Sequence, residues 1–131
     1  MKYTALKLEY ENKLNKLSDE VGLFWAFNRS QFDEGMKKNP SKKYTSIGMG
    51  GYLPSENVGK YIQGTKTLSK WYKEAKKTVK KEEAILYELY NYECFYTGDI
   101  TNAYEALSDS YTKEEVLQVY YNHKNEAQAS L

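Results

Sequence analysis

The stretch Tyr44-Thr45-Ser46-Ile47-Gly48-Met49-Gly50-Gly51-Tyr52-Leu53-Pro54-Ser55 carries the signals that decide the fold. Its first residues include β-branched side chains and predict a strand over residues 44–49. Its three glycines favour a β-bulge or a close approach of the backbone to another group. Pro54 followed by Ser55, a typical N-cap residue, is the start signal of a long helix. The stretch therefore combines one strand, one glycine turn and one helix start.

The residues before this stretch predict two helices and another strand. An amphipathic helix over residues 4–17 is indicated by apolar side chains at spacings of four, four and three, namely Leu6, Tyr10, Leu14 and Leu17. The dense apolar run from Val21 to Phe27 is rich in aromatics and favours a strand over residues 22–27. Asn28 with Gln31 three residues later is a variant of the capping box, and it predicts a helix over residues 29–38.

The residues after the stretch predict only helices, over residues 55–79, 82–96, 100–108 and 113–122. No breaker separates the first two, yet one straight helix of that length would span about 60 Å, so a bend or break is expected near residues 80–83. Thr112 and Glu115 form a capping box for the last helix. We therefore predict one domain over residues 1–131, of the α+β class and mainly helical, with four to five helices and a small two-stranded β element.

Composition disfavours several classes of protein. The longest apolar run has seven residues, whereas about 20 are needed to span a bilayer, and the charged N-terminus lacks the apolar core of a secretory signal. We therefore expect a cytoplasmic protein with no membrane partner. One cysteine (Cys94) and one histidine (His123) disfavour a disulfide framework, a cysteine zinc cluster and a Ser-His-Asp triad. No catalytic residue, metal site or cofactor is predicted.

The net charge of +1 hides a strong asymmetry along the chain. Residues 1–36 carry five basic and six acidic side chains, a net charge of −1. Residues 37–81 carry twelve basic and two acidic side chains, a net charge of +10. Residues 82–131 carry two basic and ten acidic side chains, a net charge of −8. A basic middle and an acidic end indicate where partners could dock.

Lysines recur at helical spacing in the basic middle. Lys66, Lys70, Lys73, Lys77 and Lys81 fall within about 80° of arc on one helix, with Lys80 at the edge. These six lysines are the candidate partner- or phosphate-binding residues. The alternative is the solvated face of an amphipathic helix. Base-specific DNA recognition is disfavoured because the chain has a single arginine, Arg29.

Two smaller groups of residues are further candidates. Gly50 and Gly51 lack the spacing of known phosphate-binding loops, so they form either a structural turn or a ligand-contacting loop. Asn91 and Glu93 lie near the end of a predicted helix, where they could form a polar site or simply hydrogen-bond the helix terminus. Fourteen tyrosines against four phenylalanines favour a protein interface, although a compositional bias of the genome would have the same effect.

Several segments together resemble a family of small, mostly phage-borne proteins of undefined function. The matching segments are Phe24-Trp25-Ala26-Phe27-Asn28 with Gln31-Phe32 and Glu34-Gly35, residues 44–52, Tyr87-Glu88-Leu89-Tyr90-Asn91-Tyr92-Glu93, Tyr96-Thr97-Gly98-Asp99, and Ala106-Leu107 with Thr112, Glu114, Glu115 and Val116. The family often has histidine at the position of Tyr92. The resemblance implies a phage or mobile element in a bacterial host, and it implies no reaction.

These observations favour a non-enzymatic binding protein that inhibits a bacterial defence system, of the anti-CRISPR or anti-restriction type. Its expected partner is a host defence nuclease or the complex that contains it. The alternative is a nucleic-acid-binding accessory protein that uses the lysine face. A small enzyme acting on a nucleotide, with Glu88, Asn91 and Glu93 as polar groups, is a third hypothesis and requires a pocket in which these groups converge. The sequence leaves the target and the oligomeric state open.

Overall fold

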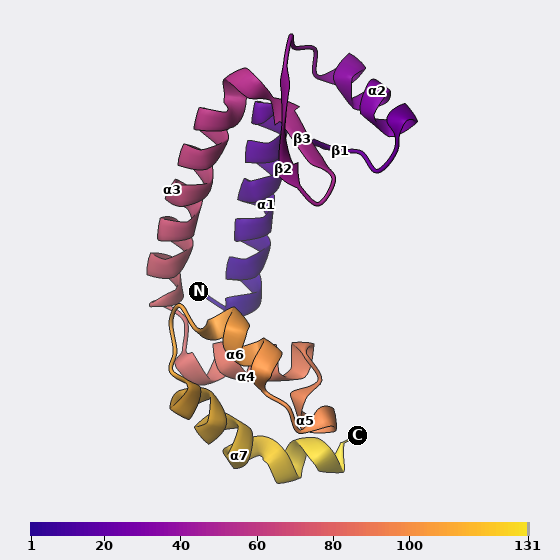
Figure 1. Cartoon of the computed structure of the whole chain (residues 1–131). Helices are drawn as coiled ribbons and strands as arrows, with labels where there is room; N and C mark the ends of the chain where they lie inside the picture. Colours follow the sequence, from indigo (N-terminus) through magenta and orange to yellow (C-terminus); the bar gives the residue numbers. More distant parts are fainter. Residues whose placement is uncertain (131) are drawn as a thin grey trace. The chain divides into compact units, whose positions relative to one another are not determined.

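The computed structural model describes residues 1–130, which form seven α-helices, one 3-10 helix and three β-strands (Figure 1). In chain order these are α1 (Tyr3–Val21), β1 (Phe24–Trp25), α2 (Arg29–Lys38), β2 (Tyr44–Gly48), β3 (Gly51–Pro54), η1 (Ser55–Asn57), α3 (Val58–Lys76), α4 (Lys81–Asn91), α5 (Cys94–Thr97), α6 (Thr101–Leu107) and α7 (Lys113–Ala129). The chain is therefore mainly helical with a small antiparallel sheet. No helix within residues 1–130 is both long and apolar enough to cross a membrane.

The chain divides into two compact units. Unit 1 contains residues 1–7 and 72–131, and unit 2 contains residues 8–71. The single domain predicted from the length of the chain remains a prediction, and each unit is described separately below.

Unit 2 combines a helical pair with the sheet. The strands lie in the order β1-β3-β2 and all pair antiparallel, with Phe24 opposite Tyr52 and Tyr44 opposite Pro54. The parts of α1 and α3 in this unit run antiparallel, because Val21 accepts a hydrogen bond from Asn57 while Leu17 lies against Gly64 further along α3. Leu17, Val21 and Leu53 form the buried cluster of the unit, so the sheet packs on α1 through β3.

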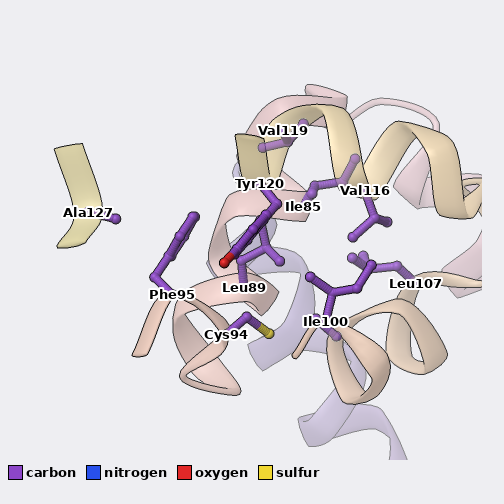
Figure 2. Close-up of a cluster of buried hydrophobic side chains, with 11 residues drawn as sticks. Ile85, Leu89, Cys94, Phe95, Ile100, Leu107, Val116, Val119, Tyr120 and Ala127 are labelled. Atoms are coloured by element: carbon purple, nitrogen blue, oxygen red, sulfur yellow. The ribbon is translucent and has the colours of Figure 1, made fainter. Parts of the chain in front are cut away.

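Unit 1 is a helical cluster with a continuous core (Figure 2). Eleven buried residues from α4 to α7 and the adjoining turns make up this core: Ile85, Leu89, Cys94, Phe95, Ile100, Ala103, Leu107, Val116, Val119, Tyr120 and Ala127. The rings of Phe95 and Tyr120 stack within this core, with their centroids 5.2 Å apart, on the side of Ala127 (Figure 2). The helices of this unit therefore pack against one another through a shared apolar core.

The predicted two-stranded element is wrong, because the sheet has three strands. The missing strand is β3, where Gly51, Tyr52, Leu53 and Pro54 resemble a loop that leads into a helix. Two positive φ angles, at Met49 and Gly50, reverse the chain directly after β2. The reversal places Gly51 and Leu53 on the buried side of the sheet, and β3 becomes its central strand.

The predicted four to five helices are also too few. The helix predicted over residues 82–96 is two helices, because α4 ends at Asn91 and Glu93 has left-handed backbone geometry (φ +55°). This reversal lets Cys94 and Phe95 enter the core, and Gly98 ends α5 with a second positive φ. Helix α1 runs to Val21 and leaves β1 only two residues, whereas a strand was predicted over residues 22–27.

Candidate functional site

Four large apolar side chains are exposed around the end of the sheet in unit 2. Trp25 is 55% exposed, Phe27 75%, Ile47 38% and Met49 92%. Trp25 ends β1, Phe27 follows two residues later, and Ile47 and Met49 flank the end of β2. We call these four residues the sheet-end patch. Large apolar side chains that are exposed close together in the chain and in the sheet are typical of a binding surface.

The two candidate loop glycines, Gly50 and Gly51, lie directly beneath this patch. A Cβ atom at Gly50 would lie 2.5 Å from the ring of Phe27. A Cβ atom at Gly51 would lie 2.7 Å from Ile47 and 3.0 Å from the indole of Trp25. The two distances below 3.0 Å are shorter than those of real Cβ atoms, so Phe27 and Ile47 can lie against the backbone here because both positions are glycine. Gly50 thus leaves room for Phe27, and Gly51 leaves room for Ile47 and Trp25.

The turn at the tip of the patch has an unfavourable residue at its centre. Both central residues have positive φ, +53° at Met49 and +85° at Gly50, as in the two-residue type I′ turn of β-hairpins. Asparagine, aspartate and glycine are preferred there, and a residue such as methionine costs on the order of 1 kcal/mol in the left-handed region. The Met49 side chain is 92% exposed and gains almost no packing in return. Stability of the folded chain therefore does not explain this methionine.

One face of the sheet is covered by aromatic side chains that pack against α2. Phe32 of α2 lies edge-on to Tyr44 and Tyr52, with ring centroids 5.9 and 4.9 Å away. Phe24 packs against the same rings and lies so close to Gly35 that a Cβ there would be 2.1 Å from it. The sheet-end patch is thus carried by a rigid support of strands and helix.

The six candidate lysines do not form one helical face. Helix α3 ends at Lys76, and the amide groups of residues 77–79 bond carbonyls three residues back, as in turns. Buried Val79 anchors this connection, so Lys77, Lys80 and Lys81 leave the helical register that the spacing predicted. Lys66 and Lys70 belong to unit 2, whereas the other four, Lys73, Lys77, Lys80 and Lys81, belong to unit 1.

Part of the lysine charge is neutralised within the chain. Lys77 pairs with Glu74 and Lys81 with Glu115, at 3.0 and 2.9 Å. All six candidate lysines are exposed, and within residues 1–130 the other four, Lys66, Lys70, Lys73 and Lys80, form no ion pair. Unit 2 carries ten basic and seven acidic side chains (+3) and unit 1 nine basic and eleven acidic (−2). The net charges of the two folded units are therefore much smaller than those of the basic and acidic segments of the sequence, +10 and −8.

A seventh lysine, Lys76, is buried and was not singled out by the sequence. Its side chain is 3% exposed, its ammonium group lies 3.0 Å from the Asp109 carboxylate, and it sits over the ring of Tyr72 at 4.6 Å. Asp109 follows α6, so the pair joins the end of α3 to the α6–α7 connection. No pattern in the sequence indicates this pair, because Lys76 resembles its exposed neighbours.

The predicted polar site near Asn91 is built around Glu88. The Glu88 carboxylate is buried and accepts hydrogen bonds from the Tyr3 hydroxyl at 2.7 Å, the Lys7 ammonium at 3.0 Å and the Asn91 amide at 3.2 Å. Burial, and next the contact with this carboxylate, raises the pKa of Tyr3 far above its usual value. Glu93 is exposed and does not join the group. The contacts surround Glu88 on several sides, as in a structural tether.

The remaining titratable candidates of the sequence are placed apart. Cys94 is buried in the core of unit 1, and burial raises the pKa of its thiol. The imidazole of His123 lies 2.5 Å from the Glu82 carboxylate on the surface of the same unit. Among residues 1–130 no group of three or more histidine, cysteine, aspartate or glutamate side chains could hold a metal ion.

Comparison with known proteins identifies a family. The model of a family of unknown function (DUF7659) matches residues 6–126, which is nearly the whole chain. No curated protein and no solved structure matches the chain significantly. The family match agrees with the resemblance to proteins of undefined function seen in the sequence, and it gives no indication of a phage or mobile-element origin.

Proposed function

We propose that this chain, which belongs to the DUF7659 family of proteins of unknown function, is a non-enzymatic binding protein that docks onto another protein through its sheet-end patch. The observation that carries the proposal is Met49, which is 92% exposed at a position where a positive φ disfavours it. A strained residue that gains no internal contact is the kind of outlier from which a role in binding is inferred.

The chemistry of the patch supports a protein partner. Trp25 and Phe27 supply large rigid rings, which are enriched where binding energy concentrates in interfaces. Met49 is flexible and polarisable, so its side chain can fill a pocket of irregular shape. We expect the partner to offer an apolar pocket for Met49 and a flat apolar rim for the two rings.

The finer part of the proposal concerns the target. We propose a protein of a phage or mobile element that blocks a bacterial defence factor, of the anti-CRISPR or anti-restriction type. This part is supported only by the sequence resemblance to phage-borne proteins. It predicts that the chain restores phage plating on a host that carries the matching defence system.

The test compares two substitutions that remove an exposed apolar side chain from unit 2. Met49→Asn acts in the patch and suits the turn, whereas Ile62→Asn acts on α3, where Ile62 is 47% exposed. We expect plating, and co-purification of a defence component, with the natural chain and Ile62→Asn but not with Met49→Asn. Retention of both by a folded Met49→Asn protein overturns the role of the patch. If the natural chain restores phage plating against none of a panel of defence systems, the proposed target is overturned.

The second candidate function, a nucleic-acid-binding accessory protein, is favoured by the exposed lysines that have no ion pair in the described chain, Lys66, Lys70, Lys73 and Lys80. Lysine contacts with phosphates would make the affinity fall as salt rises, and lysine alone would read no base sequence. A gel shift at low and moderate salt tests this function. Equal affinity of the natural chain and a Lys70→Glu, Lys73→Glu, Lys77→Glu variant contradicts it.

A further inference from the structure

A groove runs along the helical pair of unit 2, away from the residues of the sheet-end patch. It has a volume of about 470 Å³ and is lined by α1 and α3: Lys13, Lys16, Leu17, Glu20, Lys60, Gln63, Gly64, Thr67 and Leu68. Its floor is apolar, because Leu17 belongs to the buried cluster of the unit, the partly buried Leu68 packs against that cluster, and Gly64 has no side chain. Gly64 brings the helices close, since a Cβ there would lie 2.6 Å from Leu17.

The rim of this groove is basic. Lys13 and Lys16 of α1 and Lys60 of α3 are exposed, and none of them forms an ion pair within the part of the chain that the structure describes. Glu20 is the single acidic residue of the lining, so the groove carries a net charge of +2. The Lys13 ammonium lies over the ring of Trp71 at 4.8 Å, which holds it beside the groove. An apolar floor with cationic edges fits an apolar segment with acidic flanks.

The length of the groove fits a helix. Its lining spans residues 60–68 of α3, which at 1.5 Å per residue is about 12 Å, or two helical turns. Apolar side chains at positions i, i+4 and i+7 of a docked helix span nearly the same length. An antiparallel helical pair that is apolar on a further side is also the usual seat for a third helix.

We propose that the groove between α1 and α3 binds an amphipathic helix of a partner protein whose apolar face is flanked by aspartate or glutamate. The proposal concerns a second surface and does not rest on the sheet-end patch. The docked helix places its apolar side chains over Leu17, Gly64 and Leu68, and its carboxylates reach Lys13, Lys16 and Lys60.

The test uses two synthetic helical peptides of 14 residues with the same leucines at heptad positions a and d. The positions beside the leucines carry glutamate in one peptide and lysine in the second peptide. Binding is followed by fluorescence anisotropy. We expect the acidic peptide to bind at least tenfold tighter than the basic one, with an affinity that falls as salt rises. Equal binding of the two peptides overturns the proposal.

Two variants locate the binding. Thr67→Trp fills the groove from an exposed helical position and should weaken the acidic peptide at least tenfold. Changing Lys13, Lys16 and Lys60 together to Glu should reverse the preference to the basic peptide, whereas the matched control, Lys37, Lys38 and Lys42 to Glu, removes the same charge elsewhere in unit 2 and should keep it. Equal loss in both triple variants contradicts the groove, and circular dichroism checks that each variant folds.

Other occupants give different results. A chain that is dimeric alone and becomes monomeric with Thr67→Trp has a second copy in the groove, and this result overturns the proposal. Binding of decanoate that Thr67→Trp abolishes, without binding of the acidic peptide, also overturns it in favour of a small amphiphile. Met49→Asn should leave peptide binding unchanged, so failure of the groove and failure of the sheet-end patch are distinguishable.

Discussion

The two compact units differ in the size of their buried clusters and in the kind of large hydrophobic side chain that they expose. The buried cluster of unit 1 joins eleven residues of four helices and their connections, and it includes the stacked rings of Phe95 and Tyr120. The buried cluster of unit 2 joins three residues, while Trp25, Phe27 and Met49 of the same unit are more than half exposed. Apart from Met1, the large hydrophobic side chains that unit 1 exposes are tyrosines, which keep a polar hydroxyl in water, whereas those that unit 2 exposes are the fully apolar or indole side chains of Leu8, Trp25, Phe27, Ile47, Met49 and Ile62. This difference places the candidate binding surfaces in unit 2.

The largest expected effect tests whether the apolar residues of the two units contribute differently to the free energy of unfolding. Leu89→Ala removes a fully buried side chain from the core of unit 1 and should lower the free energy of unfolding by about 3 kcal/mol through lost burial and a residual cavity. Trp25→Ala removes a larger but half-exposed side chain and should cost about 1 kcal/mol or less. Urea unfolding measures both, and a Trp25→Ala loss as large as that of Leu89→Ala would break the comparison.

The next effect tests the buried polar group of unit 1. Glu88→Gln keeps the shape of the side chain but weakens its contacts with Lys7 and Tyr3, and it should cost about 2 kcal/mol of unfolding free energy. Glu83→Gln, an exposed change on the same helix, is the matched control and should be nearly neutral. If the two variants unfold at the same urea concentration, the tether at Glu88 does not stabilise unit 1.

The third effect depends on pH. The folded-state pKa of Tyr3 is raised, mainly by burial, so the neutral phenol is favoured in the folded chain. The stability that this shift represents is complete below the unfolded pKa of about 10 and is lost as pH rises above it, at about 1.4 kcal/mol per pH unit. Tyr3→Phe should therefore lose less stability than the natural chain between pH 10 and 11 in urea titrations. A parallel loss in both proteins would show that Tyr3 ionises as easily in the folded chain.

The smallest effect has the opposite sign and belongs to unit 2. Met49→Asn places a preferred residue in the left-handed position of the turn and should raise the free energy of unfolding by about 0.5–1 kcal/mol. Thermal unfolding monitors this gain. A Met49→Asn protein that is less stable than the natural chain would mean that the methionine contributes to packing, and the inference from its exposure would fail.

Local signals in the sequence predicted the elements that depend on adjacent residues. The side-chain oxygen of Asn28 accepts a hydrogen bond from the backbone amide of Gln31 at 2.8 Å, and α2 covers residues 29–38 as predicted. Thr112 and Glu115 form the predicted capping box at the start of α7. Both are contacts within one helical turn, so the order of residues is enough to define them.

Features that depend on distant residues were missed. Strand β3 exists because it pairs with β1 and β2 on both sides, and no local pattern states that partner strands are present. Gly50 and Gly51 correctly indicated a turn. Trp25 and Phe27 were predicted to lie in a strand over residues 22–27, whereas Phe27 lies outside β1 and both side chains are exposed. Alternation along a strand predicts two faces, and it does not predict which end of a face remains uncovered.

The single thiol of the chain allows the opening of the core of unit 1 to be measured by chemical modification. Cys94 is buried among the core side chains, so an alkylating reagent can reach it only when this part of the chain opens. The rate of modification at increasing reagent concentration separates the frequency of opening from its equilibrium population. Because unit 2 has no cysteine, the signal reports on unit 1 alone, and the opening of one unit can be timed without engineering a label.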